Sequence, residues 1–124
     1  MDEKSVLIID DDDEIREYVV AVLAELGFIT YTAEDGLAGL QCFQTNSIDI
    51  VITDIYMPKI DGIELIQKLQ RLKPAIKILA MSGHEHDYNH DALNWAEAAG
   101  AFEVIEKPFE PDQLIEMVKI MLSQ

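Results

Sequence analysis

The sequence predicts an α/β domain in which five short strands alternate with five helices around a parallel sheet. Short, continuous apolar runs such as Val6–Ile9 are typical of strands buried on both faces. Longer stretches with apolar residues at helical spacing follow these runs, which is the arrangement of successive βαβ units. The chain has 124 residues, 49% of them hydrophobic, which suffices for the core of one domain.

In the first half of the chain, each predicted strand is followed by a predicted helix. After the strand at Val6–Ile9, apolar residues over 15–26 form one helical stripe, and Gly27 follows as its C-terminal stop. Asp12 or Asp13 can cap the first amide groups of this helix. The remaining elements of this half are a strand at 28–33, a helix at 34–45, a strand at 48–53 and a helix at 62–72.

The second half repeats the same alternation after Lys73-Pro74, which stops the third helix. It comprises a strand at 76–81, a polar loop at 82–88, a helix at 90–99, a strand at 102–105 and a helix at 112–122. The crossovers between parallel strands should be right-handed. The periodicity alone leaves the order of the strands in the sheet open.

The composition excludes several classes of protein. Nine basic against 24 acidic side chains give a net charge of −15, which would repel nucleic acids and anionic membranes. Cys42 is the only cysteine, which excludes an internal disulfide. The acidic N-terminus is unlike a signal peptide, and no apolar run approaches the ~18 residues of a membrane span. We therefore expect a cytoplasmic protein with one domain over 1–124 and no output domain.

Polar residues stand where the predicted strands end. Asp10 and Asp11 follow the first strand, Asp54 the third, Ser82 the fourth and Lys107 the fifth. The carboxyl ends of parallel strands meet at one edge of an open sheet, where ligands bind, so these side chains should converge there. Each residue alone would be read as a cap, a turn or a surface charge, but their shared placement indicates a functional site.

The chemistry of these groups indicates a divalent cation and a phosphoryl group. Neighbouring carboxylates repel one another by ~4 kcal/mol per close pair at an effective dielectric constant of about 20, and a dication removes this cost. Ligand sets made only of oxygen suit Mg²⁺, with Mn²⁺ as a substitute. One carboxylate can then act as a nucleophile, while Lys107 and Ser82 bind the phosphoryl oxygens. The edge of the sheet thus predicts metal-assisted phosphoryl transfer onto an aspartate.

These residues lie in segments that resemble the receiver domain of bacterial two-component response regulators along nearly the whole chain. Together and in this order the segments are highly specific, although any one alone would be weak. They are VLIIDDD (6–12), VITDIYMPKIDGIEL (51–65), ILAMSG (78–83), GA (100–101) and EKPF (106–109). The resemblance implies a flavodoxin-like (βα)5 fold with a parallel five-stranded sheet in the order 2-1-3-4-5.

The resemblance also implies a role for each residue at the edge of the sheet. Asp54 would be the phosphoacceptor, and Ser82 and Lys107 would bind the phosphoryl group. The Lys107-Pro108 bond is cis in similar domains, which would aim the ammonium into the site. The Mg²⁺ ligands would be the carboxylates of Asp10, Asp11 and Asp54, with Asp11 a direct ligand, and the backbone carbonyl of Tyr56.

By the same resemblance, the protein would be a signalling switch and not an enzyme that turns over a small substrate. Asp54 would take a phosphoryl group from a phosphohistidine of a sensor histidine kinase or a phosphotransfer protein. The new charge would draw Ser82 and Lys107 inward and change a face made of the fourth helix, fifth strand and fifth helix. That face would contact an unknown downstream protein, with the chain as a monomer or a weak, phosphorylation-linked homodimer.

The sequence departs from the family pattern near the expected switch. Receivers commonly carry Tyr or Phe three residues before the lysine, and Val104 cannot change rotamer as a ring does. Tyr56 and His84 occupy positions that influence the access of hydrolysing water in receivers, so we expect this pair to set the lifetime of the phosphorylated form. The histidines at 84, 86 and 90 allow a transition-metal site, but without a cysteine or fixed scaffold a solvated loop is favoured.

Three other functions fit parts of the sequence. A haloacid-dehalogenase-type phosphatase also uses an aspartate and Mg²⁺, and Asp10-x-Asp12 matches its motif superficially, but the chain is too short for the usual cap and Asp54 would be idle. A flavodoxin-like electron carrier needs a loop rich in hydroxyls and amides where the aspartates stand. A degenerate receiver that serves as a fixed binding module would not require the complete set of residues. We therefore favour the phosphorylation switch.

Overall fold

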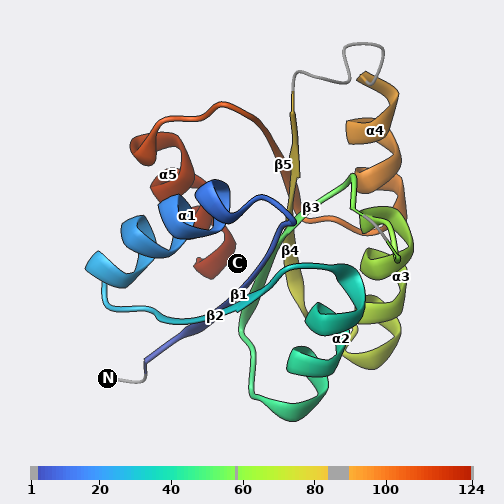
Figure 1. Ribbon diagram of the computed structural model, residues 1–124, viewed down its shortest axis with the longest axis horizontal. Helices are drawn as coiled ribbons and strands as arrows, with labels where there is room; N and C mark the ends of the chain where they lie inside the picture. The colour runs from blue at the N-terminus through green and yellow to red at the C-terminus, as the bar shows by residue number, and fades with distance from the viewer. Residues whose placement is uncertain (1–2, 58, 84–89, 124) are drawn as a thin grey trace.

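The computed structural model, which describes residues 3–57, 59–83 and 90–123, has the predicted α/β fold (Figure 1). The strands are β1 (Ser5–Ile9), β2 (Ile29–Ala33), β3 (Ile50–Asp54), β4 (Lys77–Ser82) and β5 (Glu103–Glu106). The helices are α1 (Asp13–Glu25), α2 (Gly36–Thr45), α3 (Gly62–Leu72), α4 (His90–Ala99) and α5 (Pro111–Leu122). All neighbouring strands pair in parallel, in the order β2-β1-β3-β4-β5, which confirms the flavodoxin-like topology.

The helices cover both faces of the sheet, with α1 and α5 on one side and α2, α3 and α4 on the other (Figure 1). The side chains of β1 alternate between these two cores. Val6 and Ile8 pack with α1 and α5, whereas Leu7 and Ile9 pack with α2 and α3. Complete burial of such a side chain contributes about 1.5–3 kcal/mol, which favours an apolar residue at each position from Val6 to Ile9. This is the physical basis of the continuous apolar run in the sequence.

Aspartates begin three of the helices. Asp12, Asp35 and Asp61 are the N-caps of α1, α2 and α3, and each carboxylate accepts a hydrogen bond from a backbone N–H of the first turn. Gly27 and Gly100 follow α1 and α4 with φ of 93° and 124°, a conformation that favours glycine. Of the two predicted candidates for the cap of α1, Asp12 and Asp13, the structure uses Asp12, and the predicted stop at Gly27 is confirmed.

Element boundaries differ from the predictions by two residues at most. α2 begins at Gly36 and not at residue 34, because Asp35 is used as its cap. β3 begins at Ile50 and not at residue 48: Ile48 is buried, but its carbonyl accepts a hydrogen bond from the Lys73 ammonium in place of a neighbouring strand. In both cases a side chain has taken the place of a regular backbone hydrogen bond.

The described residues also bear on membrane-spanning helices and on Cys42. None of the helices in these ranges is long and apolar enough to span a membrane. Cys42 is half-buried and packs against the core beneath α2 and α3. The expectations for His84 and His86 and for the side chain of His90 lie outside what the structure describes.

Candidate functional site

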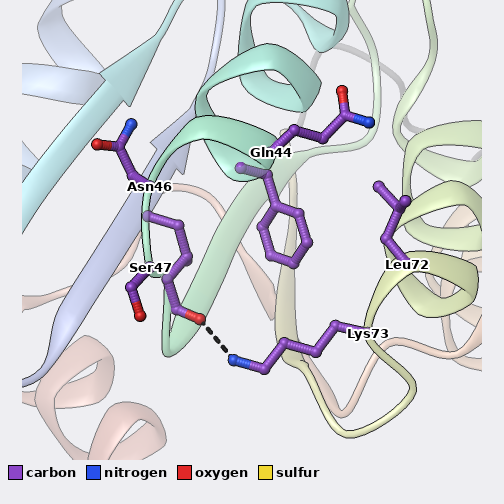
Figure 2. A pocket seen from close by; sticks show the side chains of 7 residues that line it. Gln44, Asn46, Ser47, Leu72 and Lys73 are labelled. Carbon is purple, nitrogen blue, oxygen red and sulfur yellow. Dashed lines mark hydrogen bonds between the residues drawn. The ribbon is translucent and has the colours of Figure 1, made fainter.

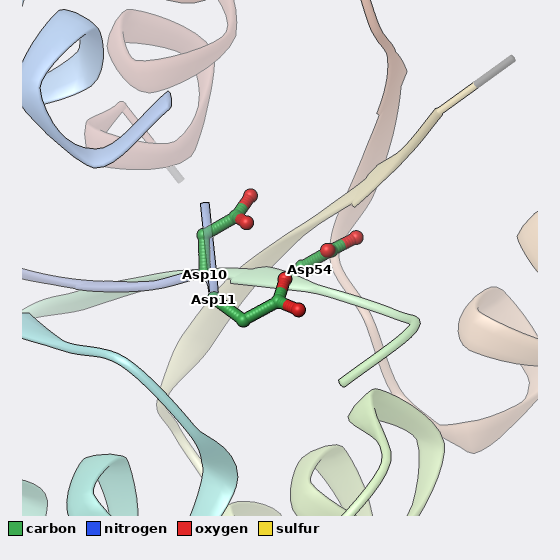
Figure 3. A group of neighbouring side chains, drawn as sticks. All are labelled: Asp10, Asp11 and Asp54. Carbon is green, nitrogen blue, oxygen red and sulfur yellow. The ribbon is translucent and has the colours of Figure 1, made fainter. Parts of the chain in front are cut away.

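The register of the sheet brings the predicted residues to one edge. Asp10 directly follows β1, and Asp54 is the last residue of β3, which runs beside β1. One carboxylate oxygen from each of Asp10, Asp11 and Asp54 lies within 4.8 Å of the others, and Figure 3 shows these side chains at the ends of the two strands. The predicted convergence of the three carboxylates is therefore present. We call these three residues the acidic triad.

Asp10 is the most constrained member of the triad. Its side chain is fully buried; one carboxylate oxygen accepts from the Asp12 N–H at 2.9 Å and the other from the Lys107 ammonium at 2.7 Å. Its backbone N–H donates to the Ala33 carbonyl at 3.2 Å, and its own carbonyl accepts from the Arg16 guanidinium at 2.6 Å. Contacts with β2, α1 and the residue after β5 thus hold this one residue in place.

Lys107 links the fifth strand to the triad. Its Nζ lies 2.7 Å from the nearer oxygen of Asp10 and 3.4 Å from Oδ2 of Asp54. Its backbone N–H donates to the Ser82 carbonyl at 2.6 Å, which ties the ends of β4 and β5 together. The Lys107-Pro108 peptide bond is cis, in agreement with the resemblance. The structure therefore brings Lys107 to the two buried carboxylates. Ser82, whose carbonyl accepts this backbone bond, is also buried.

Asp54 is the member of the triad with the most perturbed ionisation. Burial and, to a lesser extent, the charge of Asp10 raise the pKa of Asp54 to about 6, although Lys107 and the Ile55 N–H favour its charged form. Burial also raises the pKa of Asp10 against the opposing effect of Lys107. Burial lowers the pKa of Lys107, but its contacts with Asp10 and Asp54 outweigh this and leave the pKa raised.

The three carboxylates of the triad outnumber the single ammonium that the structure shows in contact with them, so the site carries excess negative charge. Asp11, the third carboxylate, is exposed and lies at the opening of the site. A group of carboxylates with excess negative charge and an open side has the donor chemistry of a hard divalent cation. The triad therefore fits the acidic pocket that holds Mg²⁺ in receiver domains.

The β3–α3 loop, which follows Asp54, depends on close backbone contacts. Gly62 donates its N–H to the Ile55 carbonyl at 2.8 Å. A Cβ at this glycine would lie 2.4 Å from the Asp54 carbonyl oxygen and 2.6 Å from the Ile55 Cα, so any side chain here would force the backbone to shift. Gly62 therefore allows α3 to approach β3 closely. Sequence reasoning missed this contact, for which the available signal was a glycine at the first position of a helix.

The structure places Tyr56 and Val104 but does not test their expected roles. Tyr56 is half-buried two residues after Asp54 and packs against the core beneath α2 and α3, and its role as a carbonyl ligand stays a prediction. Val104 is half-buried on β5 beside Ala80 of β4, in the position where receivers commonly carry an aromatic ring. Phe102 is more exposed, at 37%, and the Lys77 ammonium lies 5.3 Å from the centre of its ring.

Arg16 is a second residue that sequence reasoning missed. It lies in the first turns of α1, and its guanidinium contacts the Asp10 carbonyl and the Asp13 carboxylate. Only 17% of its side chain is exposed. The available signal was a lone arginine among acidic residues, one helical turn after the aspartates.

A cavity of about 410 Å³ lies at the opposite edge of the sheet, between the C-terminal ends of α2 and α3 (Figure 2). The Lys73 ammonium donates across it to the Ile48 carbonyl at 2.9 Å, and Phe43 and Leu72 supply apolar walls. None of its described lining residues is acidic, so it lacks the chemistry of the triad.

A flavodoxin-like sheet with an acidic triad and a lysine at its carboxyl edge defines the class of signalling domains that are phosphorylated on aspartate. The chain belongs to the response regulator receiver domain family, which it matches over residues 6–119. This is a family of phosphoacceptor domains and not of catalytic enzymes. It excludes the phosphatase and electron-carrier alternatives, and Asp12 of the suspected phosphatase motif is occupied as the cap of α1.

Curated relatives and solved structures agree with this assignment. NtrC of Escherichia coli K12, a DNA-binding transcriptional regulator, is 30% identical over 95% of this chain but only 24% of its own length. FixJ of Bradyrhizobium diazoefficiens, a transcriptional regulatory protein, is 33% identical over 96% of this chain and 57% of its own length. The chain thus spans about a quarter of NtrC and little more than half of FixJ.

Two solved receiver structures match almost end to end. A response regulator receiver domain protein of Clostridium thermocellum superimposes with a TM-score of 0.86 and 30% identity, covering 97% of this chain and 94% of its own. A CheY-like receiver domain protein of Methanospirillum hungatei JF-1 gives 0.91 and 28%, with coverage of 98% and 95%.

Proposed function

We propose that Asp54 is the phosphoacceptor of a signalling switch whose phosphoryl group comes from a phosphohistidine. The observation that carries this proposal is the convergence of the acidic triad and Lys107 at one edge of the sheet. Family membership supports a histidine kinase as the source of the phosphoryl group. Whether the immediate donor is a sensor kinase or a phosphotransfer protein is set by partners of this chain, and both carry the same phosphohistidine chemistry.

The contacts of the triad favour Asp54 over its neighbours as the nucleophile. Both carboxylate oxygens of Asp10 are already engaged, and its side chain is fully buried. Asp54 keeps one oxygen that has only a longer contact, 3.4 Å from the Lys107 ammonium, and 8% of its side chain remains exposed. A phosphoryl donor can therefore reach Asp54, whereas Asp10 serves to hold Lys107. Exposed Asp11 is left to reach toward a cation at the opening.

We assign the cation site to Mg²⁺, with Mn²⁺ as a substitute. Asp10, Asp11, Asp54 and the carbonyl of Tyr56 would hold it, since oxygen ligands and excess negative charge suit a hard dication. When bound, Mg²⁺ supplies positive charge that offsets the repulsion between the carboxylates and an incoming phosphoryl group.

The remaining steps belong to the side chains of the protein. An oxygen of Asp54 attacks phosphorus, an O–P bond forms, and the P–N bond to the donor histidine breaks, with the electron pair returning to the imidazole. The Lys107 ammonium moves from the carboxylates to the phosphoryl oxygens, and the Ser82 hydroxyl donates to another of them. Lys107 and Ser82 are joined through their backbones, so their movement would change the α4-β5-α5 face.

This face would then contact an unknown downstream protein, and the chain would act as a monomer or a weak homodimer linked to phosphorylation. The net charge of −15 supports a protein partner in preference to a nucleic acid or a membrane. A reducing, ATP-containing compartment such as the cytoplasm suits this chemistry. We retain one receiver domain over residues 1–124 as a prediction.

Incubation with acetyl phosphate and Mg²⁺, followed by intact mass measurement, tests this proposal. We expect wild type to gain the mass of one phosphoryl group and Asp54→Asn to gain none. A wild-type chain that stays unmodified and binds neither Mg²⁺ nor beryllofluoride would instead be a degenerate receiver. Phosphate release from a generic ester over many turnovers would contradict the assignment to a phosphoacceptor.

The lifetime of the phosphorylated form offers a second test, at the residues expected to control water access. We expect Tyr56→Ala and His84→Ala to change the dephosphorylation rate several-fold, because side chains at these positions would shield the acyl phosphate. The measurement is loss of phosphorylated mass with time after removal of the donor. Rates equal to wild type in both variants would show that this pair has no such role.

A further inference from the structure

The β1–α1 turn contains Asp10 and Asp11, and one side chain of α1 reaches back to it. The Arg16 guanidinium donates through Nη1 to the Asp10 carbonyl at 2.6 Å, while Nη2 pairs with the Asp13 carboxylate. The backbone N–H of the same residue donates to the Asp12 carbonyl at 3.1 Å. Main chain and side chain of Arg16 therefore both hold the turn that carries the triad.

The two interactions of the Arg16 guanidinium differ in how much they stabilise the structure. The Asp13 side chain is 78% exposed, and ion pairs at such positions contribute little because water screens them. The Arg16 side chain is only 17% exposed, and its bond to the Asp10 carbonyl is a charge-assisted hydrogen bond to a residue with no exposed surface. The carbonyl bond is thus the interaction that justifies burying an arginine here.

This bond acts on Asp11 through the geometry of the peptide. The carbonyl of Asp10 lies in the planar peptide unit that it shares with the N–H and Cα of Asp11. Fixing that oxygen limits the rotation of the plane and so the direction in which the Asp11 side chain leaves the backbone. Asp11 is the exposed member of the triad, and the structure shows its neighbours Asp10 and Asp12 held by hydrogen bonds.

We propose that Arg16 is a positioning residue, which orients the Asp10-Asp11 peptide so that the triad is ready for a divalent cation. The inference rests on the proposed function and adds a residue to it. Charge alone predicts the opposite effect: a guanidinium near the triad repels a dication, so removing it should tighten binding. Positioning predicts weaker binding after its removal, because partners that orient metal ligands typically contribute 10–100-fold in affinity.

Mg²⁺ titration calorimetry on the purified chain separates these effects. The variants are Arg16→Gln, Arg16→Lys and the control Arg71→Gln, which removes an equal charge from an exposed residue in the last turn of α3, away from the triad. We expect Arg16→Gln to weaken Mg²⁺ binding about ten-fold and Arg71→Gln to leave it unchanged or slightly tighter. Arg16→Lys keeps the charge but loses the planar fork, so it should also bind more weakly than wild type.

Thermal unfolding without Mg²⁺ is measured in parallel, since a purely structural arginine would lower the melting temperature and leave Mg²⁺ affinity intact. That result, or an Arg16→Gln affinity equal to or tighter than that of the Arg71→Gln control, would overturn the inference. If Arg16→Gln does not fold, Arg16→Lys decides: an affinity equal to wild type contradicts positioning. A wild-type chain that binds no Mg²⁺ would refute the proposed function, whereas equal binding by wild type and variants refutes only the role of Arg16.

Discussion

The two edges of the sheet use polar side chains in different ways. At the amino edge, Ser5 donates from its N–H to the Asp49 carboxylate at 2.8 Å and from its hydroxyl to the Ser47 carbonyl at 2.5 Å. Nearby, the Lys73 ammonium donates to the Ile48 carbonyl (Figure 2). Each of these donors joins two chain segments through a matched acceptor. At the carboxyl edge, by contrast, Lys107 faces more carboxylates than it neutralises.

This difference indicates that the amino edge of the sheet stabilises the fold, whereas the carboxyl edge gives up stability to hold charged groups. Matched hydrogen bonds at the amino edge stabilise the fold by about 1 kcal/mol each and leave little for a ligand to add. The raised pKa of Asp54 shows that the carboxyl edge instead holds charge at a cost to the folded state. A cation at the triad would recover that cost, which is the physical reason to expect a ligand at this edge and not at the other.

Substitution of Lys107 and of Lys73 should show the largest difference between the two edges in the free energy of unfolding. Lys107→Met leaves Asp10 buried without its ammonium, and we expect a loss of about 4 kcal/mol without Mg²⁺ at pH 7. Lys73→Met at the amino edge removes a single hydrogen bond and should cost about 1 kcal/mol. Urea unfolding measures both, and equal losses would mean that the edges do not differ as argued.

Asp54→Asn should instead stabilise the protein without Mg²⁺, and the gain should depend on pH. Because burial raises the pKa of Asp54 from 3.8 to about 6, the folded state binds the proton more tightly than the unfolded state. The stability that the protein gains from protonated Asp54 is therefore fully present below pH 3.8 and is lost as pH rises through about 6. Asparagine avoids this loss, so we expect a gain of up to about 3 kcal/mol at pH 7.5.

The measurement for Asp54→Asn is urea unfolding at pH 5 and pH 7.5, where the gain should be clearly smaller at the lower pH. Added Mg²⁺ should reduce the gain at pH 7.5, because the cation stabilises the charged form of the wild type. A gain that is the same at both pH values would show that repulsion and burial at Asp54 do not control stability.

Gly62→Ala should damage both stability and the site. The added Cβ would lie 2.4 Å from the Asp54 carbonyl oxygen, so the backbone must shift at a cost of about 2 kcal/mol. Gly27→Ala is the control: its φ of 93° makes alanine strained there, but nothing lies within 4 Å of the new Cβ. We expect calorimetry to show weaker Mg²⁺ binding for Gly62→Ala only. Equal Mg²⁺ binding by both variants would show that the close approach of α3 to β3 does not affect the site.

The smallest effect is expected from Ser5→Ala at the amino edge. It removes the hydroxyl bond to the Ser47 carbonyl and the weaker hydroxyl contacts with the carboxylate and N–H of Asp49. It keeps the backbone bond to the Asp49 carboxylate, so it should cost about 1 kcal/mol. Mg²⁺ affinity and phosphorylation by acetyl phosphate should equal those of wild type. A change in either would show that the two edges are coupled through β1.

Much of the site was predictable because its residues follow strands. Asp10, Asp11, Asp54 and Lys107 each stand at or just after an apolar run, and parallel pairing brings such positions together whatever the order of the strands. Gly62 could not be assigned this way, since its importance lies in the closeness of α3 to the backbone of β3. The role of Val104 and the expected functions of Tyr56 and Ser82 stay predictions.

The sequence by itself determined the alternation of strands and helices, a cap of the first helix at Asp12 or Asp13, and the residues that stand at the carboxyl edge. These depend on the local period of apolar residues and on hydrogen bonds between near neighbours, which a sequence displays directly. Only the tertiary structure decided that Lys107 binds Asp10 more closely than Asp54, and that Arg16 holds the Asp10 carbonyl. Such choices depend on distances of a few tenths of an ångström between segments that folding alone brings together.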